Sequence, residues 1–85
     1  MKKYLAVFRS RTDVLSFIDT LRKLGVYAIA VQTPSEAKIG CGISAEFSII
    51  GKSIAIGLIN SGNFSSFYGF FEVERKGKSS TVKRL

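Results

Sequence analysis

The sequence contains no histidine, no tryptophan, a single cysteine and a single proline. Serine-nucleophile triads and metal-dependent hydrolysis normally need histidine, and so does a Cys/His metal cluster. Because Cys41 is the only cysteine, a disulfide within the chain is also excluded. The six acidic residues are scattered and form no evident catalytic pair. We therefore expect no metal, no cofactor and no self-contained enzyme.

Long apolar runs are also missing. No run reaches the roughly 18–20 residues that a membrane span requires. The N-terminus has a basic start, but its apolar stretch ends at Phe8 and is followed by Arg9, so it lacks the core of a secretory signal. We expect a cytoplasmic protein without membrane contact, in which Cys41 stays reduced.

Acidic residues are absent from the last eleven positions, where five of the thirteen basic side chains lie. Residues 1–74 carry the other eight basic and all six acidic side chains, a net charge of +2, although the whole chain has +7. The positive charge is therefore concentrated at the C-terminus. We predict one domain at residues 1–75 and a basic, flexible tail at 76–85.

Apolar spacing and turn residues divide the chain into six elements. Ser10 suits a helix N-cap, an apolar stripe follows at helical spacing, and Gly25 suits the helix end. Alternating apolar residues at 43, 45, 47 and 49 indicate a strand with one buried face. In order, we predict a strand at 4–8, a helix from Ser10 to Gly25, a strand at 26–31, a strand from Ile43 to Ile49, a helix at 52–60 and a strand at 67–75.

This order predicts an α+β fold of the ferredoxin-like βαββαβ type, a four-stranded antiparallel sheet with two helices on one face. The first and last strands carry apolar side chains at consecutive positions, which indicates that both faces of the sheet are covered. A homodimer formed through the sheet would supply the missing cover, and it would also reinforce a domain this small.

The stretch from Thr33 to Gly42 is predicted to be a loop that contains one chemically interesting residue, Cys41. The flanking Gly40 and Gly42 leave the thiol accessible, and Lys38 could lower its pKa. A thiolate of this kind could accept a sulfur atom and pass it on as a persulfide. A free cysteine can equally be a small buried apolar residue, and both interpretations stay open on this ground.

Thr33-Pro34-Ser35-Glu36, then Gly40-Cys41-Gly42-Ile43 and Phe47, resemble the pattern of a family of small bacterial domains described as selenium/sulfur carrier-like. The resemblance covers residues 4–74, and its specific portion is the Thr-Pro turn with the Cys-Gly pair. It implies that Cys41 carries sulfur or selenium, with Gly42 as its motif partner. A desulfurase-like donor enzyme and an acceptor protein would be the partners.

Two functions of other classes remain as alternatives. One is a dimeric interaction or regulatory domain without chemistry, since ferredoxin-like sheets host many functions. The other is RNA binding, because residues 67–73 resemble the aromatic RNP1 pattern of RNA-recognition modules. That stretch follows the second helix instead of preceding it, and the domain body is nearly neutral, so we do not expect nucleic acid as the partner.

Overall fold

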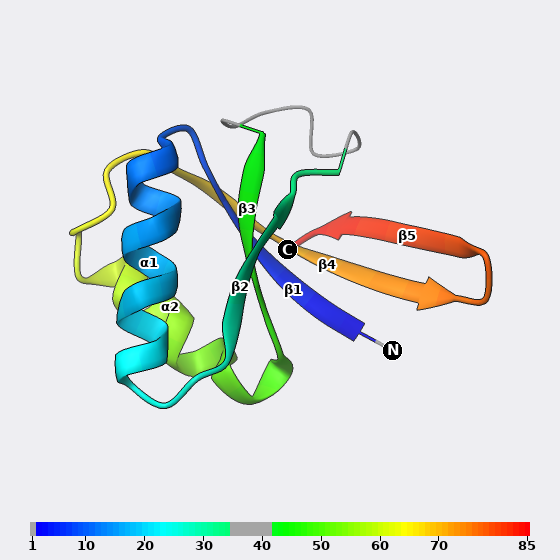
Figure 1. The fold of residues 1–85 in the computed structure, drawn as a ribbon, viewed down its shortest axis with the longest axis horizontal. Coiled ribbons are helices and arrows are strands. Elements are labelled where there is room, and N and C mark those ends of the chain that lie inside the picture. Colours follow the sequence, from blue (N-terminus) through cyan, green and yellow to red (C-terminus); the bar gives the residue numbers. More distant parts are fainter. Residues whose placement is uncertain (1, 35–41) are drawn as a thin grey trace.

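The computed structural model describes residues 2–34 and 42–85, which form a five-stranded sheet with two helices. The chain runs through β1 (Lys2–Phe8), α1 (Arg11–Lys23), β2 (Ala28–Gln32), β3 (Ile43–Phe47), a 3₁₀ turn (Ile49–Gly51), α2 (Lys52–Asn60), β4 (Phe67–Lys76) and β5 (Ser79–Arg84). The strand order is β2-β3-β1-β4-β5, and each neighbouring pair is antiparallel (Figure 1). Among the described residues, no helix is long and apolar enough to cross a membrane.

The predicted βαββαβ order is present from β1 to β4, but the predicted number of four strands is wrong because β5 follows. Gly77, with φ of 59°, lies in a two-residue turn between Lys76 and Ser79, the first residue pair of the β4–β5 hairpin. Val82 then packs beside Val73 on one face of the sheet. Residues 76–85, placed outside the sheet by the sequence analysis, thus contribute the end of β4 and all of β5.

Helix α1 forms where its sequence signals predict it. The Ser10 side chain accepts a hydrogen bond from the Asp13 backbone N–H at 3.4 Å, and Gly25 ends the helix with φ of 84°. The Asp13 carboxylate in turn accepts hydrogen bonds from the backbone N–H and the hydroxyl of Ser66. These bonds join the start of α1 to the segment that leads into β4.

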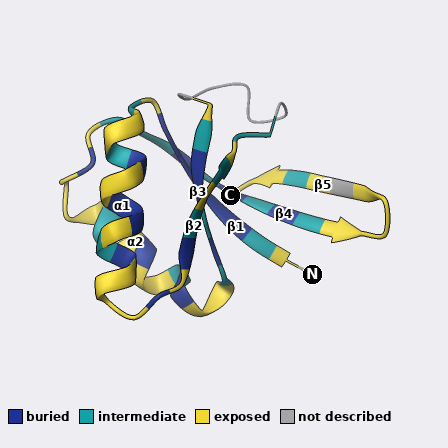
Figure 2. Cartoon of the chain, in the orientation of Figure 1, coloured by how far each residue is buried: buried dark blue, intermediate teal, exposed yellow. Residues whose placement is uncertain are grey.

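The main core lies between the sheet and both helices, which cover the same face (Figures 1 and 2). Aromatic rings fill its centre. Phe8 lies 5.1 Å from Phe17 of α1 and 5.9 Å from Phe64, measured between ring centroids. Such pairs contribute about 0.5–1.5 kcal/mol each beyond the burial of their area.

A second cluster covers the opposite side of the sheet, which we call the helix-free face. Side chains of β1 alternate between the faces, so Tyr4, Ala6 and Phe8 point to the helices while Leu5 and Val7 point away. Leu5 and Val7 are 1% and 0% exposed. They pack with Phe71 and Val73, and the cluster is completed by Val31, Tyr68 and Val82.

The expectation that both faces are covered is therefore met within one chain. The side chains that suggested a dimer are already buried by β2, β4 and β5. Dimerisation stays a prediction, and its argument from uncovered apolar residues no longer applies.

Strand β3 is shorter than predicted. It ends at Phe47 because residues 49–51 form the 3₁₀ turn, and Ile49 is 61% exposed instead of sharing the buried face of Ile43, Ala45 and Phe47. Helix α2 begins directly afterwards and matches its predicted range of 52–60. Strand β2 begins at Ala28, two residues later than predicted, since Val26 closes the turn after α1 by donating its N–H to the Leu21 carbonyl.

Two glycines around α2 provide a matched test of packing. A methyl group on the buried Gly51 would lie 2.4 Å from Val26 Cγ1, whereas one on Gly57 would meet nothing within 4 Å. We predict that Gly51→Ala lowers the free energy of unfolding by about 1–3 kcal/mol through overpacking. Gly57→Ala, within the helix, should raise it by about 0.5–1 kcal/mol. Urea unfolding of both variants checks the pair, and equal effects of the two would contradict this packing.

Candidate functional site

The candidate site is the connection between β2 and β3. Cys41, Lys38 and Gly40 lie outside the residues that the structure describes. The two ends of the connection, which we call its stems, lie within them: residues 33–34 follow β2, and Gly42 precedes β3. Strands β2 and β3 pair from Ala28 opposite Phe47 to Gln32 opposite Ile43. The predicted loop from Thr33 to Gly42 thus connects two adjacent antiparallel strands, of which β2 is an edge strand of the sheet.

Two hydrogen bonds close the base of this connection. The Thr33 backbone N–H donates to the Gly42 carbonyl at 2.9 Å, one step beyond the last strand pair. The hydroxyls of Thr33 and Ser44 lie 2.6 Å apart and share a hydrogen bond. Ser44 is fully buried, so its hydroxyl needs such a partner. The threonine of the Thr-Pro motif therefore fixes one stem to the other.

Gly42 is exposed and has φ of 95°. This is a backbone conformation that residues with a side chain rarely adopt, although an added methyl group would meet nothing within 4 Å. The glycine that follows Cys41 is thus required by the backbone where the chain enters β3. From the sequence, Gly42 was expected to leave the thiol accessible; its positive φ is a second reason for glycine at this position.

The two stems lie at the end of the sheet where β1 ends and α1 begins. Ala6 of β1 pairs with Ala45 of β3, and continuing this register places Phe8 opposite Ile43. Phe8 is also paired with Phe67, at the start of β4. Arg9 therefore follows β1 at the same end of the sheet from which the Cys41 connection leaves (Figure 1).

A hollow of about 290 Å³ lies beside one stem, on the helix-free face. Its lining is mixed, with apolar side chains from three strands and a few polar ones: Leu5, Val31, Gln32, Pro34, Glu46, Val73 and Arg75. Pro34 is the last described residue before Cys41, so the hollow adjoins the start of the connection.

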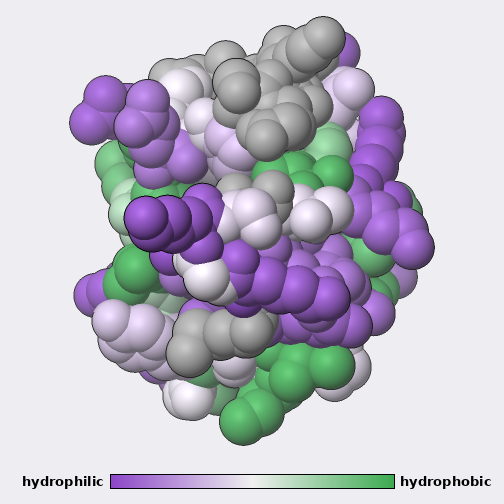
Figure 3. Space-filling model, turned by 90° about the vertical axis from the view of Figure 1, so that its right-hand side faces the viewer, coloured by the Kyte–Doolittle hydropathy of each residue, from purple (hydrophilic) through white to green (hydrophobic). Residues whose placement is uncertain are grey.

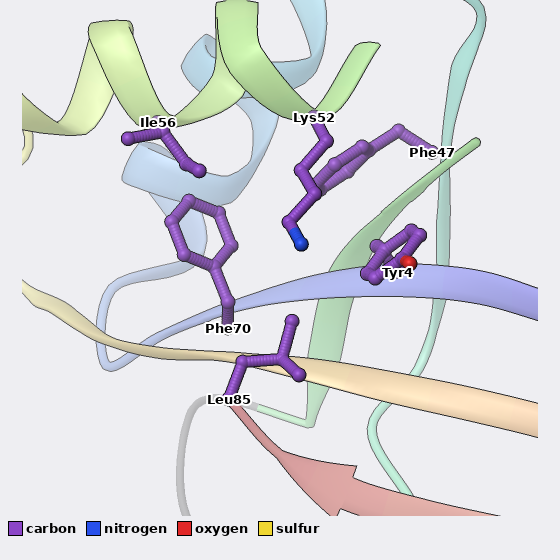
Figure 4. A pocket seen from close by; sticks show the side chains of 6 residues that line it. All are labelled: Tyr4, Phe47, Lys52, Ile56, Phe70 and Leu85. Atoms are coloured by element: carbon purple, nitrogen blue, oxygen red, sulfur yellow. The ribbon is translucent and has the colours of Figure 1, made fainter. Parts of the chain in front are cut away.

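A second, apolar cavity of about 140 Å³ lies between α2 and the sheet (Figure 4). It is lined by Tyr4, Phe47, Lys52, Ile56, Phe70 and Leu85, and the Lys52 ammonium lies 5.3 Å from the centre of the Tyr4 ring. Tyr4 is four residues from Phe8 on β1, roughly 13 Å along the strand from the end at which Thr33 and Gly42 lie. The cavity is also smaller than the ~300–1,000 Å³ usual for small-molecule sites.

The described residues do not form the aromatic platform that RNA-recognition modules use. On the helix-free face, the two central strands present Leu5 and Val7 from β1 and Ser44 and Glu46 from β3. Of the aromatic residues in 67–73, Phe67 and Phe70 face the helices and Phe71 is 4% exposed. The RNP1-like stretch is therefore mainly a packing element. No group of metal-ligating side chains occurs among the described residues.

The sequence indicated Thr33 only as part of the Thr-Pro turn and did not indicate Ser44, so the contact between the two hydroxyls was missed. A polar residue before proline at the end of a strand, facing a serine in the next strand, is the signal that could have indicated this contact.

We predict a coupling of about 1 kcal/mol between the side chains of Thr33 and Ser44 in a double-mutant cycle of Thr33→Val and Ser44→Ala. Unfolding in urea measures it, and purely additive losses would show that the hydroxyl pair contributes nothing specific.

The chain is similar to one known protein family. Residues 3–67 match the model of a family described as "Putative Se/S carrier protein-like". The match covers most of the chain and includes the whole β2–β3 connection with Cys41. The chain belongs to this family, so the resemblance seen in the sequence is confirmed. No curated protein and no solved structure gave a significant match.

Proposed function

We propose that this member of the selenium/sulfur carrier-like family carries sulfur or selenium on the thiol of Cys41. The observation that carries the proposal is the family match across residues 3–67, which spans the connection containing the only cysteine of the chain. The chemistry of the residues agrees with it, since a cysteine is the one side chain here that can form a bond to either element.

The proposed transfer starts with the Cys41 thiolate. The thiolate attacks the terminal sulfur of a persulfide on a donor protein, and a new S–S bond forms at Cys41 as the donor's own S–S bond breaks. The bond's electron pair leaves with the donor as a thiolate, which takes up a proton from water. Cys41 then holds a persulfide, and a thiolate on the acceptor removes its outer sulfur in the same way.

The neighbouring residues have supporting roles in this proposal. Lys38 is three residues from Cys41 in the sequence, and its positive charge would favour the thiolate over the thiol. Gly40 and Gly42 would leave room for the sulfur of a partner protein to approach. The hydrogen bonds from Thr33 to Gly42 and Ser44 hold the two ends of the connection together.

The alternatives predict different behaviour of the thiol. In an interaction domain without chemistry, Cys41 would be a packing residue with ordinary or low reactivity. A carrier requires a thiol that reacts in the folded protein near neutral pH. The pH dependence of alkylation therefore separates the two functions.

We predict that iodoacetamide alkylates Cys41 in the folded protein with an apparent pKa below the ~8.5 of a free cysteine. Lys38→Met should raise this pKa toward the free value, because it removes the nearby positive charge. Lys78→Met removes the same charge from the exposed β4–β5 turn and serves as the control, which should leave the pKa unchanged. Alkylation only after denaturation would reject the carrier function.

A further inference from the structure

The β4–β5 hairpin distributes its charges unequally between its two faces. Glu72 and Glu74 of β4 point to the same side as Tyr4, where they pair with Lys2 at 3.7 Å and Lys76 at 3.6 Å. Arg84 lies on the opposite, helix-free face. Arg84 of β5 is paired with Phe71, a member of the cluster on that face. Of the acids that the structure describes, only Glu46 lies on the helix-free face.

Arg84 is held in a fixed position on this face by Tyr68. Its guanidinium carbon lies 4.5 Å from the centre of the Tyr68 ring, and it donates hydrogen bonds to the Tyr68 hydroxyl at 3.1 Å and carbonyl at 3.3 Å. Gly69 makes room for it, because a methyl group there would lie 3.3 Å from Arg84 Nε. Two of the five guanidinium N–H groups are used in this way, which leaves three for a ligand.

Arg9 is the second cation at the same ring. Its guanidinium carbon lies 6.0 Å from the centre of the Tyr68 ring, and its side chain is exposed. Two guanidinium groups around one ring are therefore at most 10.5 Å apart, the sum of the two distances. Within the part of the chain that the structure describes, no carboxylate forms an ion pair with either.

We infer that Arg9 and Arg84, arranged around Tyr68, form a docking surface for an acidic segment of the protein that exchanges sulfur or selenium with Cys41. The inference rests on the proposed function for the identity of this partner. Arginine binds carboxylates through two parallel hydrogen bonds, and a guanidinium already held in place loses little freedom on binding. Alternate side chains of an extended segment lie roughly 7 Å apart, a spacing that falls within the upper limit of 10.5 Å between the two guanidinium carbons.

The position of the surface agrees with a role in transfer. Arg9 follows β1, and Tyr68 is the second residue of β4, at the end of the sheet from which the Cys41 connection leaves. A partner bound there would lie at the same end of the sheet as Thr33 and Gly42, between which the connection runs. Arg9 lies within the residues 3–67 that match the family, whereas Tyr68 and Arg84 lie outside them, so the match covers only one of the two cations of this surface.

Other occupants fit the face less well. A second copy of the chain would place arginines against arginines, which is repulsive. Single-stranded nucleic acid normally stacks its bases on open aromatic rings, but the Tyr68 ring already carries Arg84 and lies parallel to Phe71 at 6.2 Å. Figure 3 views the molecule from the side on which the hairpin projects, and hydrophilic residues dominate the middle of that view.

The test uses a fluorescent peptide of alternating glutamate and serine, titrated with the full chain carrying Cys41→Ser. We expect salt-sensitive binding and the largest amide chemical-shift changes around Arg9, Gly69 and Arg84. Arg9→Gln with Arg84→Gln should weaken binding roughly tenfold, since each change removes one charge-assisted contact. Lys23→Gln with Lys78→Gln removes the same charge elsewhere and should weaken it by less than about twofold.

Equal losses in the two double variants would overturn the inference, because they would mean unspecific attraction to a basic protein. Tighter binding of an oligouridylate at the same amides would replace the acidic segment with nucleic acid. If Arg84→Gln fails to fold, Arg9→Gln alone tests the inference, since the Arg9 side chain is exposed and lies over the Tyr68 ring. Arg9→Gln should then weaken peptide binding roughly threefold. Since Cys41 is absent from this measurement, an unreactive thiol would reject the carrier function and leave the docking result standing.

Discussion

The burial of β1 on both faces is the constraint on which the rest of the structure depends. Residues 4–8 are all buried, and the strand pairs with β3 on one side and β4 on the other. Its alternate side chains face the helices and the helix-free face. Full burial of apolar side chains of this size contributes about 1.5–3 kcal/mol each, so neither face can be left open without a large loss.

This constraint explains why the sheet has five strands. Two helices can cover one face of β1, and the other face needs cover from elsewhere in the chain. Strand β5 contributes Val82, while β2 contributes Val31 from the opposite edge of the sheet. A chain of 85 residues can bury only a small core, so a few added contacts such as that of Val82 matter for its stability.

The elements with strong local signals could be predicted from the sequence. Ser10, the apolar stripe and Gly25 determine α1 because the capping and burial signals agree. Strand β5 was missed because the five positive charges in and around it indicate solvent, although Val82 packs against the cluster on the helix-free face. The burial of Ile49 was mispredicted because alternation continues in the sequence for two residues after β3 has ended.

The candidate site shows the same division between local and long-range information. Cys41 and its glycines are visible in the sequence, and the conformation of Gly42 is a local requirement. The bond between Thr33 and Ser44 joins residues eleven positions apart, and the arrangement of Arg9 and Arg84 around Tyr68 depends on the pairing of three strands. Contacts of this kind follow from the register of the sheet, which no short motif records.

The family match and the hairpin have complementary places in this account. The matched residues include the cysteine connection and Arg9, whereas Tyr68 of β4 and Arg84 of β5 lie beyond them. In the proposals above, the chemistry belongs to the matched part of the chain, and partner recognition uses residues of both parts.

The central claim is that Cys41 accepts and releases a chalcogen atom, and intact mass spectrometry during a single transfer tests it most directly. The folded protein is mixed with a persulfide-loaded desulfurase, separated, and then offered a thiol acceptor. The account predicts a gain of one sulfur mass that is lost to the acceptor, with no gain in Cys41→Ser. An unchanged mass in the wild-type protein, or an equal gain in Cys41→Ser, would contradict it.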